Sequence, residues 1–223
     1  MTIALSEQLT NRFFRYLAVS SQSDAASPTL PSTEGQHKMA QMLAEELRQL
    51  GLEDILIDEH ATVTARKPGN QPTAPRIGFI THIDTVDVGL SPDIHPQRLR
   101  FTGSDLCLNA EQGIYLRTAE HPEILRYQGE EIIFSDGTSV LGADNKAAVT
   151  VVMTLLENLT ADDCMAISWW RLFLTKRLVC AVLKRWIWRV LMLISLTLLT
   201  AASWAKWCMK TLTPPRQRSI SSG

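Results

Sequence analysis

The sequence predicts an α/β domain within its first 163 residues. Two amphipathic segments with helical spacing come first, and short segments rich in β-branched residues follow them. The apolar run of residues 77–81 then ends abruptly in His82 and Asp84, as expected when a buried strand reaches the edge of a sheet. Helices, then strands, then polar groups at a strand end are typical of a sheet covered by helices.

Two helices are predicted at the start of the chain. The first carries apolar and aromatic side chains at helical spacing up to residue 17, before a Ser- and Pro-rich loop at residues 20–31. The second begins at Thr33, which with Gln36 has the spacing of a capping box, and ends before Gly51, a suitable C-cap residue. Its predicted apolar face consists of Met39, Met42, Leu43, Leu47 and Leu50.

Short strands are predicted after the second helix. Residues 55–58 and 62–65 have strand-like composition and flank a turn, so we expect them to pair. Residues 87–128 contain three scattered prolines and are expected to be irregular. Residues 132–134 and 138–141 flank Asp136-Gly137, which predicts a hairpin. A last apolar helix is expected over residues 147–159.

Polar residues at two segment ends predict a metal site. His82 and Asp84 are two residues apart, so in an extended strand they project from the same face. Asp144 lies between a short apolar segment and the last predicted helix. An imidazole and a carboxylate are suitable zinc ligands. A lone His-x-Asp pair is more commonly structural, but a second motif about sixty residues later makes the pattern more restrictive.

Three motifs together resemble the peptidase T subfamily of the dinuclear-zinc exopeptidases. They are Pro31-Ser-Thr-Glu-Gly-Gln36, Gly78-Phe-Ile-Thr-His-Ile-Asp-Thr85 and Leu141-Gly-Ala-Asp-Asn-Lys146, and the resemblance covers about residues 6–163. It implies the N-terminal part of a zinc-exopeptidase catalytic domain, with a mixed sheet flanked by helices and the lid domain absent. It also implies a tripeptide aminopeptidase that releases the N-terminal residue of a small peptide.

The resemblance assigns roles to three residues. His82 matches a ligand of the first zinc ion, and Asp144 matches the carboxylate that bridges two zinc ions. Asp84 is the residue to which we assign a catalytic role, because it matches the carboxylate that orients the metal-bound histidine. Asn145 stands where the family often has a second aspartate.

The other expected functional groups are missing from the sequence. The Pro-Asp-Glu-Glu motif, which would supply the general base and a further ligand, does not occur, and neither do the later Asp and His ligands. Two of five expected ligands remain. We therefore expect at most one weakly held Zn²⁺, no catalytic activity, and no homodimer interface of the kind that the lid forms.

A break in composition divides the chain into residues 1–163 and 164–223. All 23 acidic residues lie at or before Asp163, whereas the last 60 residues hold all six Trp and three of the four Cys. Charged residues of both signs are normally spread through a domain. A one-base shift of the reading frame at Cys164 allows the codons of the tail to spell HGDIVVAFVPDEEIG, which contains the missing motif. The tail is therefore predicted to be out of frame, and irregular or spuriously helical.

The sequence is also consistent with two other functions. A sister activity, such as a dipeptidase or an N-acyl-amino-acid amidohydrolase, would use the same zinc chemistry. A non-catalytic remnant with a membrane-prone tail is the rival from another class, because residues 186–205 form an apolar run with basic flanks. The frameshift explanation makes that run an accident of codon usage and argues against a membrane role.

Charge and cysteine usage exclude other classes of protein. A net charge of −1 argues against a nucleic-acid partner. The four cysteines have no Cys-x-x-Cys spacing, so neither a disulfide framework nor a cysteine zinc site is indicated. The N-terminus lacks the basic and apolar regions of a signal peptide, and we expect a cytoplasmic location.

Overall fold

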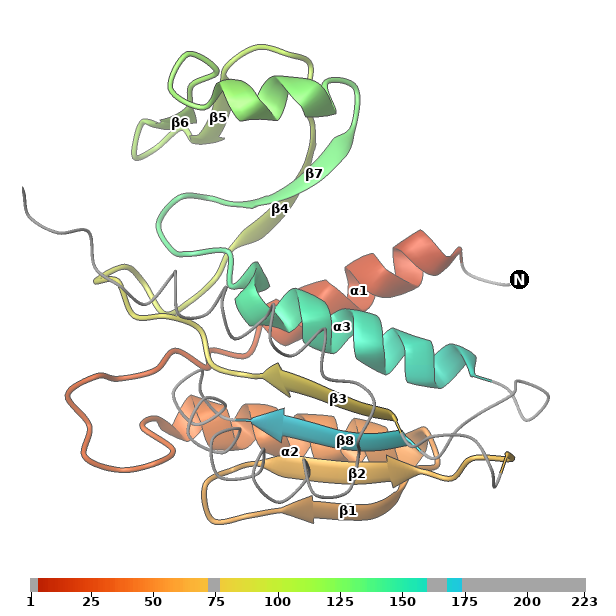
Figure 1. The fold of residues 1–223 in the computed structure, drawn as a ribbon. Helices are drawn as coiled ribbons and strands as arrows, with labels where there is room; N and C mark the ends of the chain where they lie inside the picture. The colour runs from red at the N-terminus through yellow and green to blue at the C-terminus, as the bar shows by residue number, and fades with distance from the viewer. Residues whose placement is uncertain (1–3, 72–76, 160–167, 174–223) are drawn as a thin grey trace, which may run out of the picture. The chain divides into compact units, whose positions relative to one another are not determined.

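A four-stranded mixed sheet forms the centre of the fold (Figure 1). The computed structural model describes residues 4–71, 77–159 and 168–173, all within a compact unit that spans Met1–Val179. The strand order is β1-β2-β8-β3. β1 pairs antiparallel with β2, β2 pairs antiparallel with β8, and β8 pairs parallel with β3. The strands are β1 (Glu53–Ile57), β2 (Val63–Lys67), β3 (Ile77–His82) and β8 (Ser168–Phe173).

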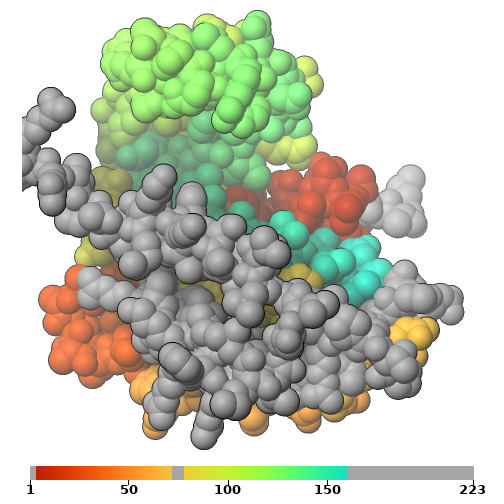
Figure 2. Space-filling model, viewed as in Figure 1, coloured from red at the N-terminus to blue at the C-terminus, as the bar shows by residue number. Residues whose placement is uncertain are grey.

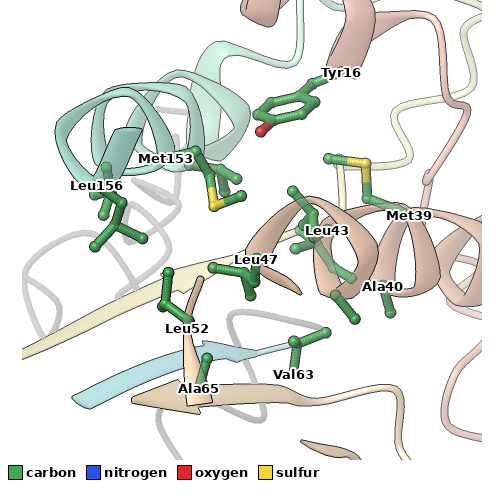
Figure 3. Packing of buried hydrophobic residues seen from close by; sticks show 14 of the residues in the cluster. Tyr16, Met39, Ala40, Leu43, Leu47, Leu52, Val63, Ala65, Met153 and Leu156 are labelled. Atoms are coloured by element: carbon green, nitrogen blue, oxygen red, sulfur yellow. The ribbon is translucent and has the colours of Figure 1, made fainter. Parts of the chain in front are cut away.

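Three helices pack with this sheet around one apolar core. They are α1 (Leu5–Leu17), α2 (Glu34–Gln49) and α3 (Ala143–Asn158). Figure 3 shows Tyr16 of α1 above side chains from α2 and Met153 of α3, with Val63 and Ala65 of β2 on the opposite side. Because α3 lies between β3 and β8 in the chain, it provides the long crossover that two parallel strands require.

The predicted α/β class, the three helices and strands β1, β2 and β3 are confirmed. At the start of α2, the Gln36 side chain accepts a hydrogen bond from the backbone N–H of Thr33 at 3.3 Å. At its end, Gly51 has a φ of +73°, which favours glycine. Met39, Leu43 and Leu47 are fully buried, and Met42 and Leu50 pack against the same core.

The region expected to be irregular contains regular structure. Between β3 and α3 lie β4 (Pro96–Arg100), β5 (Leu106–Asn109), β6 (Ile114–Leu116), the 3-10 helix η1 (Pro122–Tyr127) and β7 (Glu131–Ser135). β4 pairs with β7 and β5 pairs with β6. In Figure 2 the residues of this insertion gather into one continuous patch of green surface. Phe101 at the end of β4 is fully buried and Ile124 of η1 nearly so.

The hairpin predicted around Asp136-Gly137 is wrong. β7 confirms the strand at residues 132–134, but residues 138–141 form no strand, and the partner of β7 is β4. Asp136 instead accepts hydrogen bonds from the backbone N–H and the hydroxyl of Thr138, at 2.9 and 2.6 Å. This local turn directs the chain toward α3 rather than back along β7.

One described segment lies in the apparent out-of-frame tail. Ser168–Phe173 was expected to be irregular or helical, and it is strand β8 between β2 and β3. The boundary at residue 163 stays a prediction. Within residues 4–71, 77–159 and 168–173, no helix is both long and apolar enough to cross a membrane. The membrane-like run at residues 186–205 lies outside the described residues.

Candidate metal centre

His82 is held at the end of β3 by the carboxylate that follows it. Its side chain is 8% exposed, and its Nδ1 lies 3.0 Å from Oδ1 of Asp84. Asp84 is itself buried. The neighbouring residues Ile83 and Thr85 are also buried, and Thr85 exchanges backbone hydrogen bonds with Ser21 and Ser23. The ring is therefore fixed in orientation by a buried partner on a well-anchored segment.

Asp144 reaches His82 from the start of α3. Its Oδ1 lies 3.1 Å from Nε2 of His82. Asp144 and Asn145 have non-helical backbone angles, so the carboxylate sits where the chain turns into the helix. Gly142, just before, has a φ of +70°, and a Cβ there would lie 2.9 Å from Cγ2 of Thr85. The chain thus enters α3 against the segment that carries Asp84.

The imidazole of His82 has a carboxylate at each ring nitrogen. An ionised carboxylate only accepts hydrogen bonds, so both contacts are satisfied when the ring carries two N–H groups. In the neutral ring that is protonated only at Nδ1, Asp84 accepts the single N–H. Nε2 then presents a lone pair toward the Asp144 carboxylate, and two hydrogen-bond acceptors face each other. A metal ion bound by both Nε2 and the Asp144 carboxylate would remove that conflict.

The donor set fits two ligands of a zinc site but not a complete site. Imidazole nitrogen and carboxylate oxygen are both zinc ligands, and the Asp84 contact leaves Nε2 as the ligating atom. Catalytic zinc sites use three protein ligands. In the part of the chain that the structure describes, no group of three or more His, Cys, Asp or Glu side chains is arranged to hold a metal. No hydrolytic step can therefore be assigned to a metal held by these residues alone.

A buried lysine beside this centre was not singled out from the sequence. Lys146 is completely buried, and its ammonium donates hydrogen bonds to the backbone oxygens of Tyr16 and Val19, at 3.0 and 2.6 Å. Burial lowers the pKa of Lys146 to about 8. The sequence feature that could have indicated this burial is the position of Lys146 in the first turn of a mostly apolar helix.

The structure also contains a surface hollow of about 660 Å³. Some of its lining residues are close in sequence to Asp84, but the hollow does not include the candidate centre. Its lining consists of most of residues 18–24, residues at the start of α2, and Asp87 and Pro92. His82, Asp84 and Asp144 are not among its lining residues. The hollow is therefore not counted as part of the candidate centre.

Known proteins resemble the chain over most of its length, although no family model matches it. A peptidase T-like protein of Rhizobium meliloti is 62% identical over 153 residues, which are 69% of this chain and 38% of that protein. Peptidase T of Geobacillus kaustophilus is 42% identical over 157 residues, again 38% of its own length. The chain is similar to peptidase T.

This similarity has a limited extent. The chain spans 38% of the length of these peptidase T relatives, and the matched segments of 153 and 157 residues are close in length to the region before the break at residue 163. Among solved structures, aminopeptidase PepT from Bacillus cereus aligns with a TM-score of 0.49 and 19% identity, over 74% of this chain and 35% of that chain. The resemblance to peptidase T inferred from the three motifs is confirmed by the sequence relatives.

Proposed function

We propose that this chain is part of a zinc-dependent tripeptide aminopeptidase of the peptidase T type and is inactive by itself. The observation that carries the proposal is the contact of His82 with both Asp84 and Asp144. It is supported by 62% identity to a peptidase T-like protein over 153 residues and 42% identity to a peptidase T over 157 residues. The proposed substrate is a small peptide, and the proposed location is the cytoplasm.

The proposed roles follow from the contacts. His82 is proposed as a metal ligand through Nε2, and Asp144 as the carboxylate ligand beside it. Asp84 is proposed to keep the ring oriented and its Nδ1 protonated, which makes Nε2 the better donor. The chain contains no Pro-Asp-Glu-Glu motif to provide a general base, so metal binding alone is not expected to give turnover.

Metal titration tests the proposed site. The purified chain should bind one Zn²⁺ weakly and no second ion in isothermal titration calorimetry, and His82→Gln should abolish that binding. His95→Gln is the matched control, because His95 is 64% exposed and contacts Asp136 rather than the centre. A wild-type chain that binds no zinc, or one whose binding depends equally on His95, would contradict the metal assignment.

Hydrolysis of a tripeptide tests the proposed inactivity. With zinc or cobalt added, the chain should release no N-terminal residue above the rate of an Asp144→Ala variant. Hydrolysis that Asp144→Ala abolishes would show that the chain is a working enzyme. Release of an acyl group or cleavage of dipeptides in preference to tripeptides would favour the sister activities.

A shift of the reading frame is the proposed cause of the lack of activity. The composition break after Asp163 and the hidden HGDIVVAFVPDEEIG text support a one-base shift near Cys164. Resequencing the DNA around that codon tests this directly. A variant with the frame restored should bind two Zn²⁺ ions and hydrolyse a tripeptide, whereas a restored chain that does neither would argue for a non-catalytic remnant.

A further inference from the structure

Lys146 is an unusual group to bury completely. Its side chain has no exposed surface, and its ammonium contacts two backbone oxygens, those of Tyr16 and Val19. Within the described residues it forms no ion pair with a carboxylate. Burying an ammonium without a carboxylate partner is unfavourable because the charge loses its hydration, so an apolar side chain would serve packing better.

The two acceptors lie in the last turn of helix α1 and just beyond its end. The last carbonyls of a helix have no partner within the helix, and they form its negative pole. α1 ends at Leu17, and the carbonyls that Lys146 contacts flank that residue. The Tyr16 oxygen also accepts from the backbone N–H of Val19 at 3.3 Å, so the ammonium adds a second donor there. It does so from the first turn of another helix, α3.

This link lies in the part of α3 that carries Asp144. Asp144 and Asn145 depart from helical angles, so the regular helical geometry does not hold the carboxylate. Lys146 is the next residue along, and its backbone N–H bonds to the oxygen of Gly142 at 3.3 Å. Its carbonyl accepts from the hydroxyl of Thr150 at 2.8 Å. The ammonium and these two bonds anchor the residue at both its side chain and its backbone.

Other contacts already join α1 to α3. Arg12 of α1 bonds to the hydroxyl of Thr154 at 2.5 Å and to Glu157 at 2.7 Å, both toward the far end of α3. The two helices are therefore also joined by contacts other than those of Lys146. What the lysine adds is a fixed position for the first turn of α3, where Asp144 meets His82.

We infer that Lys146 is a positioning residue, which holds the Asp144 carboxylate against His82 by tying the first turn of α3 to the end of α1. Its importance for zinc rests on the proposed function, whereas its effect on the contact between His82 and Asp144 does not. The two consequences can be measured separately.

The test compares Lys146→Met with Lys67→Met. Lys67 also donates to a backbone oxygen of α3, that of Leu156 at 3.5 Å, but at the end far from the centre. The chain has five histidines, so the ring nitrogen signals of His82 can be assigned in a ¹⁵N-histidine-labelled sample by their loss in His82→Gln. Lys146→Met should shift the His82 Nε2 signal, and it should weaken zinc binding about 10–100-fold, as loss of a supporting contact does at metal sites. Lys67→Met should do neither.

Each outcome decides the inference. Unchanged His82 signals in a folded Lys146→Met variant would overturn it, and so would an equal shift in Lys67→Met. If Lys146→Met does not fold, Lys146→Gln takes its place, because a neutral amide of shorter reach also removes the ammonium, and the same shift is required. If the wild-type chain binds no zinc, the proposed function fails, while the His82 signals still test the role of Lys146.

Discussion

Glu46 of α2 accepts a hydrogen bond from Nε of Arg12 of α1 at 2.8 Å, and both side chains are buried. The hydroxyl of Tyr16 and the guanidinium of Arg15 also donate to Glu46, at 2.8 and 2.7 Å. Burial alone would lower the pKa of Arg12, but its hydrogen bonds to Glu157 and Glu46 outweigh that effect and raise it. One carboxylate thus collects three donors from α1 and joins that helix to α2.

Glu46→Gln should lower the free energy of unfolding by about 3 kcal/mol, because the buried charge of Arg12 then keeps only the partly exposed Glu157 as a counterion. Urea unfolding followed by circular dichroism measures this change. Glu45→Gln is the control: Glu45 pairs with Arg48 at 3.0 Å on the surface, and its loss should change stability by about 0.5 kcal/mol or less. Equal effects of the two substitutions would contradict a special role for the buried pair.

Stability should fall at alkaline pH through Tyr16. Burial, and then the charge of Glu46, raise the pKa of Tyr16 far above its ordinary value. In the unfolded chain this phenol ionises near pH 10, so above that pH the unfolded state binds fewer protons than the native state. The contribution of this group is thus complete below pH 10 and falls by about 1.4 kcal/mol for each pH unit above it.

The matched variant Tyr16→Phe isolates this contribution. It cannot ionise, so the difference in unfolding free energy between wild type and variant should shrink as the pH rises from 9 to about 11. Urea titrations at several pH values measure the difference. A constant difference across that range would show that Tyr16 titrates normally in the folded chain.

Gly35→Ala should destabilise the chain more than Gly51→Ala. A Cβ at Gly35 would lie 1.8 Å from the backbone oxygen of Ser20, so α2 or the loop before it must move. Such overpacking typically costs about 1–3 kcal/mol. At Gly51 a Cβ meets no atom within 4 Å, and the only cost is the positive φ, about 1 kcal/mol. Thermal unfolding of the two variants gives the comparison, and the reverse order would contradict it.

Asp84→Asn should weaken zinc binding about 10–100-fold without preventing folding, because the amide no longer favours a protonated Nδ1 on His82. Isothermal titration calorimetry measures the affinity. Asp87→Asn is the control, since Asp87 is exposed and accepts a hydrogen bond from the backbone N–H of Gly89. A loss of affinity in Asp87→Asn as large as that in Asp84→Asn would contradict the orienting role.

The helices and the first strands were predictable because their determinants are local. Thr33, Gln36 and Gly51 mark the ends of α2 within a few residues of the bonds they affect, and the apolar spacing marks its buried face. The pairing of β7 with β4 was not predictable in this way, because Asp136-Gly137 favours a local hairpin and the true partner lies more than thirty residues away. Pairing between distant segments depends on the packing of the whole insertion.

The amino-acid sequence by itself determined the α/β class, the three helices, the two motifs that carry His82 and Asp144, and the resemblance to peptidase T. Short-range spacing and composition are sufficient for each of these. Only the tertiary structure decided that His82 contacts Asp84 and Asp144 together, and that Lys146 is buried against the end of α1. These contacts join residues up to 130 positions apart, as for Lys146 and Tyr16, and their geometry depends on how α1, α3 and β3 pack.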